Sequence, residues 1–318
     1  MVRLVFGPVP SRRLGRSLGV NNIPPKYCTY SCTYCQAGKT THLEINRREF
    51  YPVERIISQV EEAINKLLVK IDFITVVPDG EPTLDKNLGR LAEGIKDVTT
   101  IPLAIISNSS LLWREDVRED LSLFDLVSLK IDTIDQKVWK LINRPHPELV
   151  LERILDGISV FSHDYKGKIL TETMLVKNIN DSRENITGIA SFLSNLRIDR
   201  AYIAVPTRPP AEKWVKPADE DKVLFAHEIF SERIGRNKVE LLTHYEGALF
   251  YGVGDPIDSF LSIISVHPMR IDYAYKFFEK FGLDPDETLK ELLREKKIVV
   301  RDYMGIKFVL RRIRKEHS

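Results

Sequence analysis

Apolar positions along this chain alternate between short continuous runs and helical periodicities. The runs at residues 18–23 and 71–77 predict strands, and the second run ends at the turn-forming sequence of residues 78–80. Between them, apolar residues recur every three or four positions over 53–68, which predicts a helix with one buried face. The chain therefore begins with strands and helices in alternation.

The alternation continues to about residue 242. Further strands are predicted at 102–107, 126–131, 169–176, 201–205 and 239–242. Further helices are predicted at 84–95, 114–121, 136–142, 148–161, 184–196 and 219–234. Strands that alternate with helices form βαβ units, and six or more of them predict an α/β fold with a partial (β/α)6-type parallel barrel. Such barrels place their chemistry at the carboxyl ends of the strands.

The pattern changes at about residue 255. Helices are predicted at 256–266, 271–281 and 286–295, and two short strands follow at 298–302 and 306–310, with Met304 and Gly305 in the turn between them. Helices followed by a β-hairpin resemble a winged-helix module. We therefore expect a barrel domain over residues 1–250 and a winged-helix-like domain over residues 255–318.

Composition narrows the functional classes only slightly. The 318 residues include 47 basic and 45 acidic side chains, and a net charge of +2 neither requires nor excludes a nucleic-acid partner. Residues 1–11 have no signal-peptide pattern, and no run of eighteen apolar residues occurs, which predicts a cytoplasmic protein without a membrane partner. The cysteines are more informative, because all three lie within eight residues and an odd number cannot pair off in intrachain disulfides.

Cys28, Cys32 and Cys35 are spaced so that one loop can wrap a compact metal centre. Clusters of the [4Fe-4S] kind normally take four thiolates, and this chain has only three cysteines in total. One iron of such a cluster would be left for another ligand, such as a substrate or cofactor. A zinc site formed by the three cysteines and His42 is the alternative.

The Cys-x3-Cys-x2-Cys loop, with Tyr34 just before the last cysteine, resembles the signature of the radical S-adenosylmethionine superfamily. Residues 10–15 and 143–147 are similar to one branch of it, which is related to the wyosine-forming tRNA enzymes and the molybdenum-cofactor radical enzymes. The resemblance covers about residues 5–245. It implies that Cys28, Cys32 and Cys35 hold a [4Fe-4S] cluster, and that S-adenosylmethionine chelates the open iron.

The resemblance also implies an activity. An electron from the reduced cluster would cleave the cofactor to methionine and a 5′-deoxyadenosyl radical, which abstracts hydrogen from a substrate. A one-electron donor of the flavodoxin or ferredoxin type is the implied partner. The chain has no cysteine outside the loop, unlike the wyosine-forming enzymes with their second cluster, so their substrate is not carried over.

Several residues after predicted strands match cofactor-contacting positions of the superfamily. Gly80 and Glu81 lie in a segment that resembles the glycine–glutamate motif for the methionyl amine, although Asp79 stands where a first glycine is usual. Ser107 and Asn108 match the segment that contacts the ribose and carboxylate, and Tyr34 belongs to the cofactor loop. The alternatives are a simple strand-to-helix turn at 78–83 and a helix cap at 107–110.

Residues on three later strands are weaker candidates. Lys130 and Asp132 fall on one side of the strand at 126–131, where they would bind a substrate or cofactor carboxylate or form an interior ion pair. By family position, Thr173 (with Thr171) is expected on the inner face of the strand at 169–176. The segment 205–210 is expected to frame the adenine or the substrate entrance.

The substrate is indicated only by the C-terminal region. Basic side chains there could follow the phosphates of RNA, most plausibly tRNA: Arg301, Lys307, Arg311, Arg312, Arg314 and Lys315. Two other functions stay open. One is an activase or peptide-modifying radical enzyme whose terminal domain docks a protein partner. The other is a non-catalytic protein that binds a metal or cluster.

Overall fold

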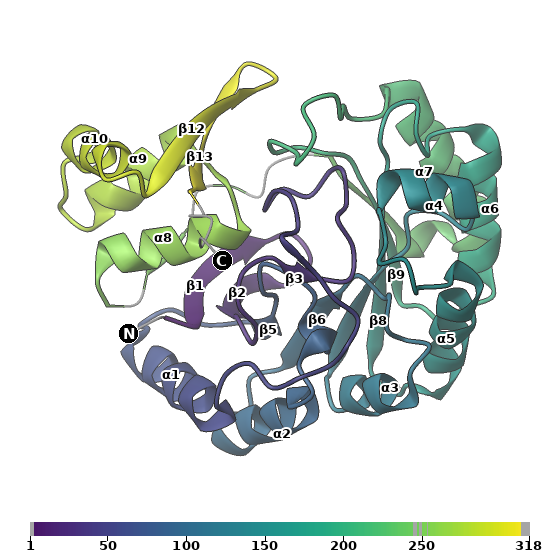
Figure 1. Ribbon diagram of the computed structural model, residues 1–318, viewed down its shortest axis with the longest axis horizontal. Helices are drawn as coiled ribbons and strands as arrows, with labels where there is room; N and C mark the ends of the chain where they lie inside the picture. Colours follow the sequence, from purple (N-terminus) through teal and green to yellow (C-terminus); the bar gives the residue numbers. More distant parts are fainter. Residues whose placement is uncertain (1–2, 244–246, 248–249, 253, 313–318) are drawn as a thin grey trace.

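The computed structural model describes residues 3–243, 247, 250–252 and 254–312. Its main body is a curled eight-stranded sheet whose helices cover the outer face (Figure 1). In spatial order, the strands are β1 (Val5–Ser11), β2 (Gly15–Val20), β5 (Phe73–Val76), β6 (Leu103–Ser107), β7 (Leu126–Lys130), β8 (Lys168–Met174), β9 (Arg200–Ala204) and β10 (Val239–Leu242). All pairs from β2 to β10 are parallel. This confirms the predicted α/β partial barrel.

The connecting helices follow the predicted periodicities closely. They are α1 (Val53–Lys66), α2 (Leu88–Val98), α3 (Glu115–Ser122), α4 (Gln136–Ile142), α5 (Leu151–Asp164), α6 (Arg183–Ser194) and α7 (Glu220–Ile234). In α1 the buried residues are Val53, Ile56, Val60 and Ala63, which is one helical face. Helix α6 begins where the Ser182 side chain accepts a hydrogen bond from the Asn185 amide. The short elements are β3 (Tyr27–Cys28), β4 (His42–Leu43) and two 3-10 turns, η1 (Pro82–Leu84) and η2 (Arg236–Lys238).

Strand β1 was not predicted from the sequence. It pairs antiparallel with β2 and forms one edge of the sheet, with an irregular register between Phe6 and Val9. Gly7, Pro8 and Pro10 interrupt its apolar pattern, and an edge strand tolerates proline because one side of it makes no ladder bonds. The cysteine loop therefore follows the second strand of the sheet, and that strand ends at Val20, earlier than the predicted residue 23.

The C-terminal unit, residues 255–312, contains α8 (Pro256–Val266), α9 (Ile271–Lys280) and α10 (Pro285–Arg294). A three-stranded antiparallel sheet accompanies them, formed by β11 (Met269–Arg270), β12 (Ile298–Tyr303) and β13 (Ile306–Arg311) in the order β11-β13-β12. Strand β11 was not predicted. The winged-helix assignment and the domain boundary remain predictions, and Arg314 and Lys315 lie outside the described residues.

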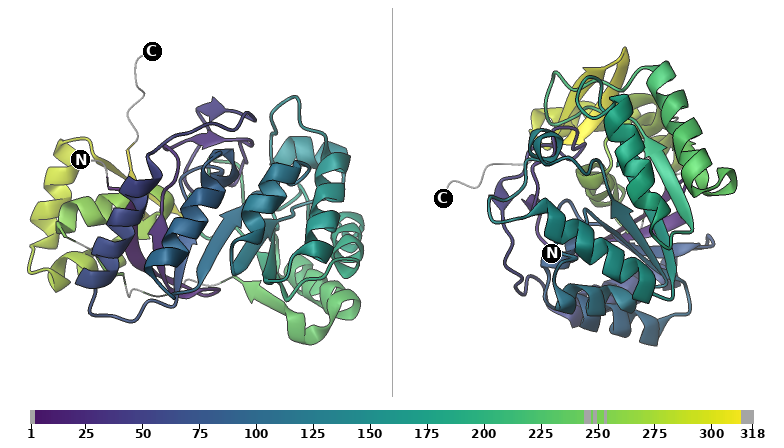
Figure 2. Two further views of the ribbon diagram at one scale, coloured as in Figure 1. Left: turned by 90° about the horizontal axis from the view of Figure 1, so that it is seen from below. Right: turned by 90° about the vertical axis from the view of Figure 1, so that its right-hand side faces the viewer.

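The C-terminal unit packs against the edge of the barrel. Phe6 of β1 is buried in one apolar cluster with Phe260, Phe278 and other residues of the unit, and α8 lies along β1. The two views in Figure 2 show the unit at one end of the sheet, beside α1. None of the described helices combines the length and the apolar character needed to cross a bilayer.

We predict that Phe260→Ala strongly destabilises the chain. Phe260 is fully buried, and its ring lies 4.5 Å from that of Phe278, so truncation leaves a cavity and costs about 3–5 kcal/mol of unfolding free energy. Urea unfolding followed by circular dichroism measures this loss. The control is Leu293→Ala on α10, which is exposed and should change the free energy by less than about 0.5 kcal/mol. Equal effects of the two variants would contradict the described core.

Candidate functional site

A cavity of about 380 Å³ lies at the carboxyl ends of the parallel strands. Its walls come from the cysteine loop, from the segments after β5, β6 and β9, and from the end of α8. Cys28, Cys32 and Cys35 all line it. The volume lies within the range of small-molecule sites, and the position is the one at which barrel enzymes carry their chemistry.

Backbone contacts hold the cysteine loop against the strand ends. The Glu81 amide donates to the Tyr27 carbonyl at 3.0 Å, and a Cβ added to Gly80 would lie only 2.0 Å from that oxygen. On the other side, the Ser31 amide donates to the Asn143 carbonyl at 3.0 Å. Glycine is therefore needed at position 80 so that the loop can approach the segment after β5.

Each of two thiols accepts a hydrogen bond from an amide side chain. Asn108 Nδ2 lies 3.5 Å from Cys28 Sγ, and Asn143 Nδ2 lies 3.4 Å from Cys32 Sγ. Burial raises the pKa of all three cysteines, that of Cys32 to about 12, with the charge of Asp132 adding to the rise at Cys32. Thiolates at this place therefore need a cation, and a bound metal centre supplies that charge and deprotonates coordinating thiols.

A buried ion pair lies beside Cys35. Lys26 Nζ is 2.8 Å from Asp79 Oδ1, both side chains are only 5% exposed, and Lys26 also donates to the Ala37 carbonyl. Burial raises the pKa of Asp79 to about 6, and the charge of Lys26 limits the rise. The other oxygen, Asp79 Oδ2, is buried and has no hydrogen-bond partner among the described residues. A ligand that carries an amine or ammonium group would satisfy it.

Glu81 is surrounded by donors from two segments. It accepts from Thr83 Oγ1 at 2.6 Å, from Ser107 Oγ at 2.8 Å and from the Asn108 amide at 2.7 Å. Burial raises the pKa of Glu81, and these hydrogen bonds oppose the rise. Glu81 also caps η1, because its side chain accepts a hydrogen bond from the Thr83 amide. The same side chain therefore belongs both to the turn and to the candidate site. Ser107 and Asn108 hold Glu81 in place.

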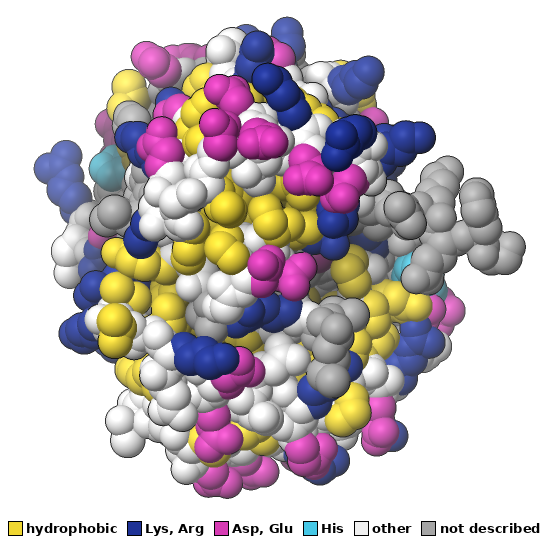
Figure 3. Space-filling view, turned by 90° about the vertical axis from the view of Figure 1, so that its left-hand side faces the viewer, with side chains coloured by type: hydrophobic (Ala, Val, Ile, Leu, Met, Phe, Trp, Pro, Cys, Tyr) yellow, Lys and Arg dark blue, Asp and Glu magenta, His cyan; other side chains and the backbone are white. Residues whose placement is uncertain are grey.

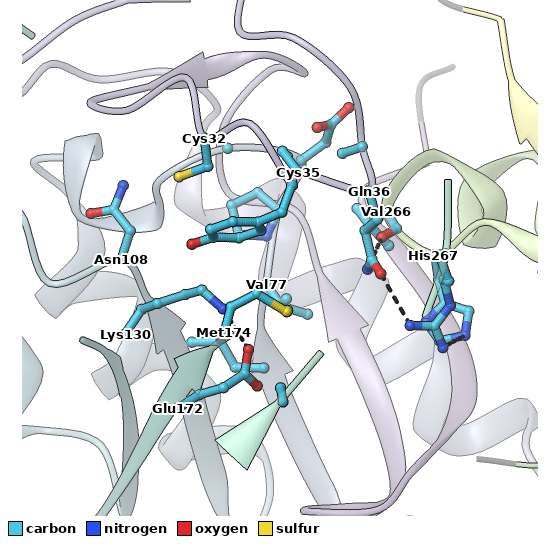
Figure 4. Close-up of a pocket in the computed structure, with 18 of the residues that line it drawn as sticks. Cys32, Cys35, Gln36, Val77, Asn108, Lys130, Glu172, Met174, Val266 and His267 are labelled. Carbon is cyan, nitrogen blue, oxygen red and sulfur yellow. Dashed lines mark hydrogen bonds and ion pairs between the residues drawn. The ribbon is translucent and has the colours of Figure 1, made fainter. Parts of the chain in front are cut away.

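A second group of charged side chains lines the cavity. Lys130 Nζ is 2.6 Å from Glu172 Oε1 and 4.8 Å from the centre of the Tyr34 ring, and Arg13 also pairs with Glu172. Figure 4 shows the Lys130–Glu172 pair facing the side of the cavity that carries Cys32 and Cys35. Burial opposes the ionisation of Glu172, but the charges of Arg13 and Lys130 outweigh it and lower the pKa of Glu172 to about 2.

Two predicted site residues lie elsewhere. Thr173 faces away from the cavity and donates to the Ile131 carbonyl at 2.8 Å, because Glu172 and Met174 occupy the inner face of β8. The prediction that Thr173 lies on the inner face of this strand was therefore wrong. Asp132 lies behind the lining residues, where it accepts from the Tyr34 hydroxyl and from Asn143 Nδ2 at 2.8 Å. It positions Tyr34 and Asn143 and does not line the main cavity.

Sequence reasoning missed Glu172 and Asn143 as site residues. Glu172 is the register partner of Lys130 in the β7–β8 ladder, so a correct alignment of those two strands would have placed it beside Lys130. Asn143 belongs to the segment at 143–147, whose resemblance to the family branch predicts no contact with a cysteine. Its contact with Cys32 joins residues 111 positions apart in the chain, which no local pattern reveals.

The zinc alternative is not supported by the position of His42. Its ring stacks on Tyr27 at 4.1 Å, its Nδ1 lies 3.0 Å from Thr41 Oγ1, and it is not among the residues that line the cavity. Within the described residues, no three His, Cys, Asp or Glu side chains converge closely enough to hold a single ion. Three thiols on one cavity wall fit a larger group, such as a [4Fe-4S] cluster, better than one zinc ion.

Comparison with known proteins agrees with this geometry. Residues 22–190 match the Radical SAM superfamily. A UPF0026 protein of Methanocaldococcus jannaschii is 46% identical over 98% of this chain and 97% of its own length. A UPF0026 protein of Helicobacter pylori is 34% identical over 96% of each chain.

A solved structure shares the fold. Streptococcus suis SuiB, bound to its precursor peptide SuiA, aligns with a TM-score of 0.53 at 18% identity, covering 70% of this chain and 48% of SuiB. The superfamily match spans more than half of the chain and includes the cysteine loop, and members of this superfamily use a [4Fe-4S] cluster and S-adenosylmethionine. The chain therefore belongs to the Radical SAM superfamily and is a radical S-adenosylmethionine enzyme.

Proposed function

We propose that Cys28, Cys32 and Cys35 hold a [4Fe-4S] cluster with one open iron, and that the adjoining cavity holds S-adenosylmethionine and a substrate. When bound, the cluster and cofactor supply one-electron reductive cleavage and the radical chemistry that removes a hydrogen atom from the substrate. The observation that carries the proposal is that all three thiols line one cavity, together with Asp79, whose buried Oδ2 has no hydrogen-bond partner in the described part of the chain.

The chain's own residues have separate roles in this proposal. Asn108 and Asn143 donate to the sulfur atoms of Cys28 and Cys32, and such hydrogen bonds tune the reduction potential of a cluster. Lys26, at the start of the loop, contacts the Ala37 carbonyl near its end and Asp79 after β5. The loop is thereby held in one arrangement before any ligand binds.

The cofactor's amino-acid end would lie near Asp79 and Glu81. Asp79 Oδ2 has an unused acceptor position there, and Glu81 is held by Thr83, Ser107 and Asn108. Both carboxylates favour an ammonium group. Lys130 lines the same cavity and pairs with Glu172, and it would also bind a carboxylate of the cofactor or of the substrate. The Tyr34 ring lies against its ammonium group.

RNA is the substrate class that we propose. The hairpin of β12 and β13 carries exposed Arg301, Lys307, Arg311 and Arg312, and its Tyr303 hydroxyl donates to the Pro206 carbonyl next to the cavity at 3.1 Å. On the face drawn in Figure 3, basic side chains are interspersed with acidic ones, so the proposal rests on the hairpin and not on a broad basic surface. The enzyme needs an electron donor, and we propose one of the flavodoxin or ferredoxin type, in the cytoplasm.

Replacement of any one loop cysteine by alanine should abolish cluster assembly. The chain has no other cysteine that could substitute, because its three cysteines are all in the loop. Iron and sulfide content and visible absorption after anaerobic reconstitution are the measurements. Ser31→Ala, between two of the cysteines, is the matched control and should assemble the cluster normally. Full iron loading in all three cysteine variants would refute the ligand assignment.

Glu81→Gln should weaken S-adenosylmethionine binding by roughly tenfold or more, because it removes a charged acceptor that is buried at the cavity. The change that the cofactor causes in the electron paramagnetic resonance spectrum of the reduced cluster measures binding. Wild-type protein should also release 5′-deoxyadenosine with dithionite and cofactor. Asp302→Asn, on the exposed hairpin, is the control. If the cofactor does not change the spectrum of the reduced cluster, and the protein releases no 5′-deoxyadenosine, the result argues for a non-catalytic centre.

RNA binding should weaken steeply with salt. If the hairpin contacts phosphates, Arg301→Ala and Lys307→Ala should each reduce the slope of log affinity against log salt by about one. Filter binding with a mixed tRNA pool measures this. Lys70→Ala, an exposed side chain before β5, is the control. If the wild type shows no salt-sensitive affinity, RNA is excluded, and a protein or peptide substrate becomes the better hypothesis.

A further inference from the structure

An open groove of about 490 Å³ adjoins the cysteine loop but is separate from the main cavity. Its walls come from Ser31, from Leu43 of β4, from the end of α4 and from the segment of residues 144–147. Tyr30 and Cys32 line the main cavity, whereas Ser31 between them lines this groove. The cysteine loop therefore borders both hollows, and we call the second one the outer groove.

The segment of residues 143–147 lies between the outer groove and the thiols. The Ser31 amide donates to the carbonyls of Asn143 at 3.0 Å and Arg144 at 3.1 Å, which fixes the segment against the cysteine loop. From the same segment the Asn143 side chain reaches Cys32, with 3.4 Å between Nδ2 and Sγ. One short segment therefore connects the wall of the groove to a proposed cluster ligand.

Arg144 has an unusual backbone conformation. Its φ is 47°, in the left-handed region that residues with a side chain rarely adopt. Its carbonyl accepts from the Ser31 amide, and its guanidinium pairs with Glu212 at 2.5 Å. Such conformations persist where the surroundings fix them, and they are concentrated at functional sites. Here the conformation belongs to a residue that lines the groove.

The surface around the groove carries accessible cations. Among the described residues, the side chains with a permanent charge that line the groove are Lys140, which is exposed, and Arg144. Arg144 shares Glu212 with Lys39, and the side chains of the two cations are 40% and 63% exposed, against 16% for the carboxylate. Glu148 is exposed nearby but does not line the groove. This surface therefore favours a partner with an acidic face.

We propose that the outer groove docks the electron donor, a small one-electron carrier with an acidic face around its redox centre. Complexes between redox proteins bury little surface and rely on charge complementarity for rapid encounter. Electron transfer slows steeply with distance, so the carrier must dock close to the cluster, and Asn143 joins the groove wall to Cys32. One electron leaves the carrier for the cluster, and no covalent bond forms or breaks. The inference rests on the proposed function, in which the three thiols hold the cluster and the main cavity is filled by cofactor and substrate.

The test follows reduction of the cluster-loaded full chain by photoreduced flavodoxin. Stopped-flow absorbance gives the second-order rate constant at several salt concentrations. We expect this rate constant to fall steeply with salt, and to be roughly tenfold lower in Lys140→Glu at low salt, because electrostatic steering accelerates association. Lys166→Glu, exposed before the amino end of β8, is the matched charge reversal and should react like the wild type. Binding of oxidised flavodoxin, measured by calorimetry, should also weaken in Lys140→Glu and not in Lys166→Glu.

Reduction by dithionite separates a docking defect from a damaged cluster. Dithionite is a small reductant that needs no docking surface, so it should reduce the wild type and Lys140→Glu at similar rates. The docking site would be overturned by a flavodoxin rate constant that does not depend on salt, by equal rates in Lys140→Glu and wild type, or by an equal loss in Lys166→Glu. Failure of flavodoxin to reduce a cluster that dithionite reduces would overturn it too.

Two further results complete the test. If Lys140→Glu loses iron, Lys140→Gln replaces it, and an unchanged flavodoxin rate in that variant would contradict the docking site. If a mixed tRNA pool loses affinity in Lys140→Glu while the flavodoxin rate stays the same, the groove binds RNA and the inference is wrong. Absence of 5′-deoxyadenosine release by wild type with dithionite and cofactor would contradict the proposed function instead, whatever the flavodoxin rate.

Discussion

The buried pair of Lys26 and Asp79 is the interaction on which the site depends. Lys26 begins the cysteine loop and contacts the Ala37 carbonyl near its end, while Asp79 belongs to the segment after β5. Lys26 therefore joins the two ends of the loop through the Ala37 carbonyl, and its pair with Asp79 fixes the loop to the barrel. Breaking such a buried pair by removing one partner costs roughly 3–5 kcal/mol, because the remaining charge stays out of water. Without that pair, the loop would be held to the barrel mainly by backbone contacts such as the one between the Glu81 amide and the Tyr27 carbonyl.

The same pair explains a departure from the superfamily pattern. Asp79 stands where a first glycine is usual, so the segment carries a charge at that position. One oxygen of Asp79 pairs with Lys26, and the other is buried and has no hydrogen-bond partner among the described residues. A single substitution thus contributes both to the closure of the loop and to the electrostatics of the ligand site. Gly80 keeps the close approach to Tyr27 that makes this possible.

Sequence patterns predicted the barrel because most of its parallel strands contain a short apolar run, and these runs alternate with helical periodicities. They failed at β1, where Gly7, Pro8 and Pro10 obscure an edge strand. At the site, the motif residues Cys28 and Glu81 could be found because their neighbours in sequence are also neighbours in space. Thr173 was assigned to the wrong face of β8. The middle of this strand is buried on both faces, so its sequence shows no alternation that tells which residues face the cavity.

The contacts that no sequence pattern could reveal are those between distant segments, and they are also the ones that distinguish this chain from a bare barrel. Asn143 reaches Cys32 from the segment after α4, and Gln36 reaches Val266 from the cysteine loop. In the second case a residue beside a proposed cluster ligand is bonded to the C-terminal unit. The arrangement of the cysteine loop and the packing of the C-terminal unit are therefore joined by a direct hydrogen bond.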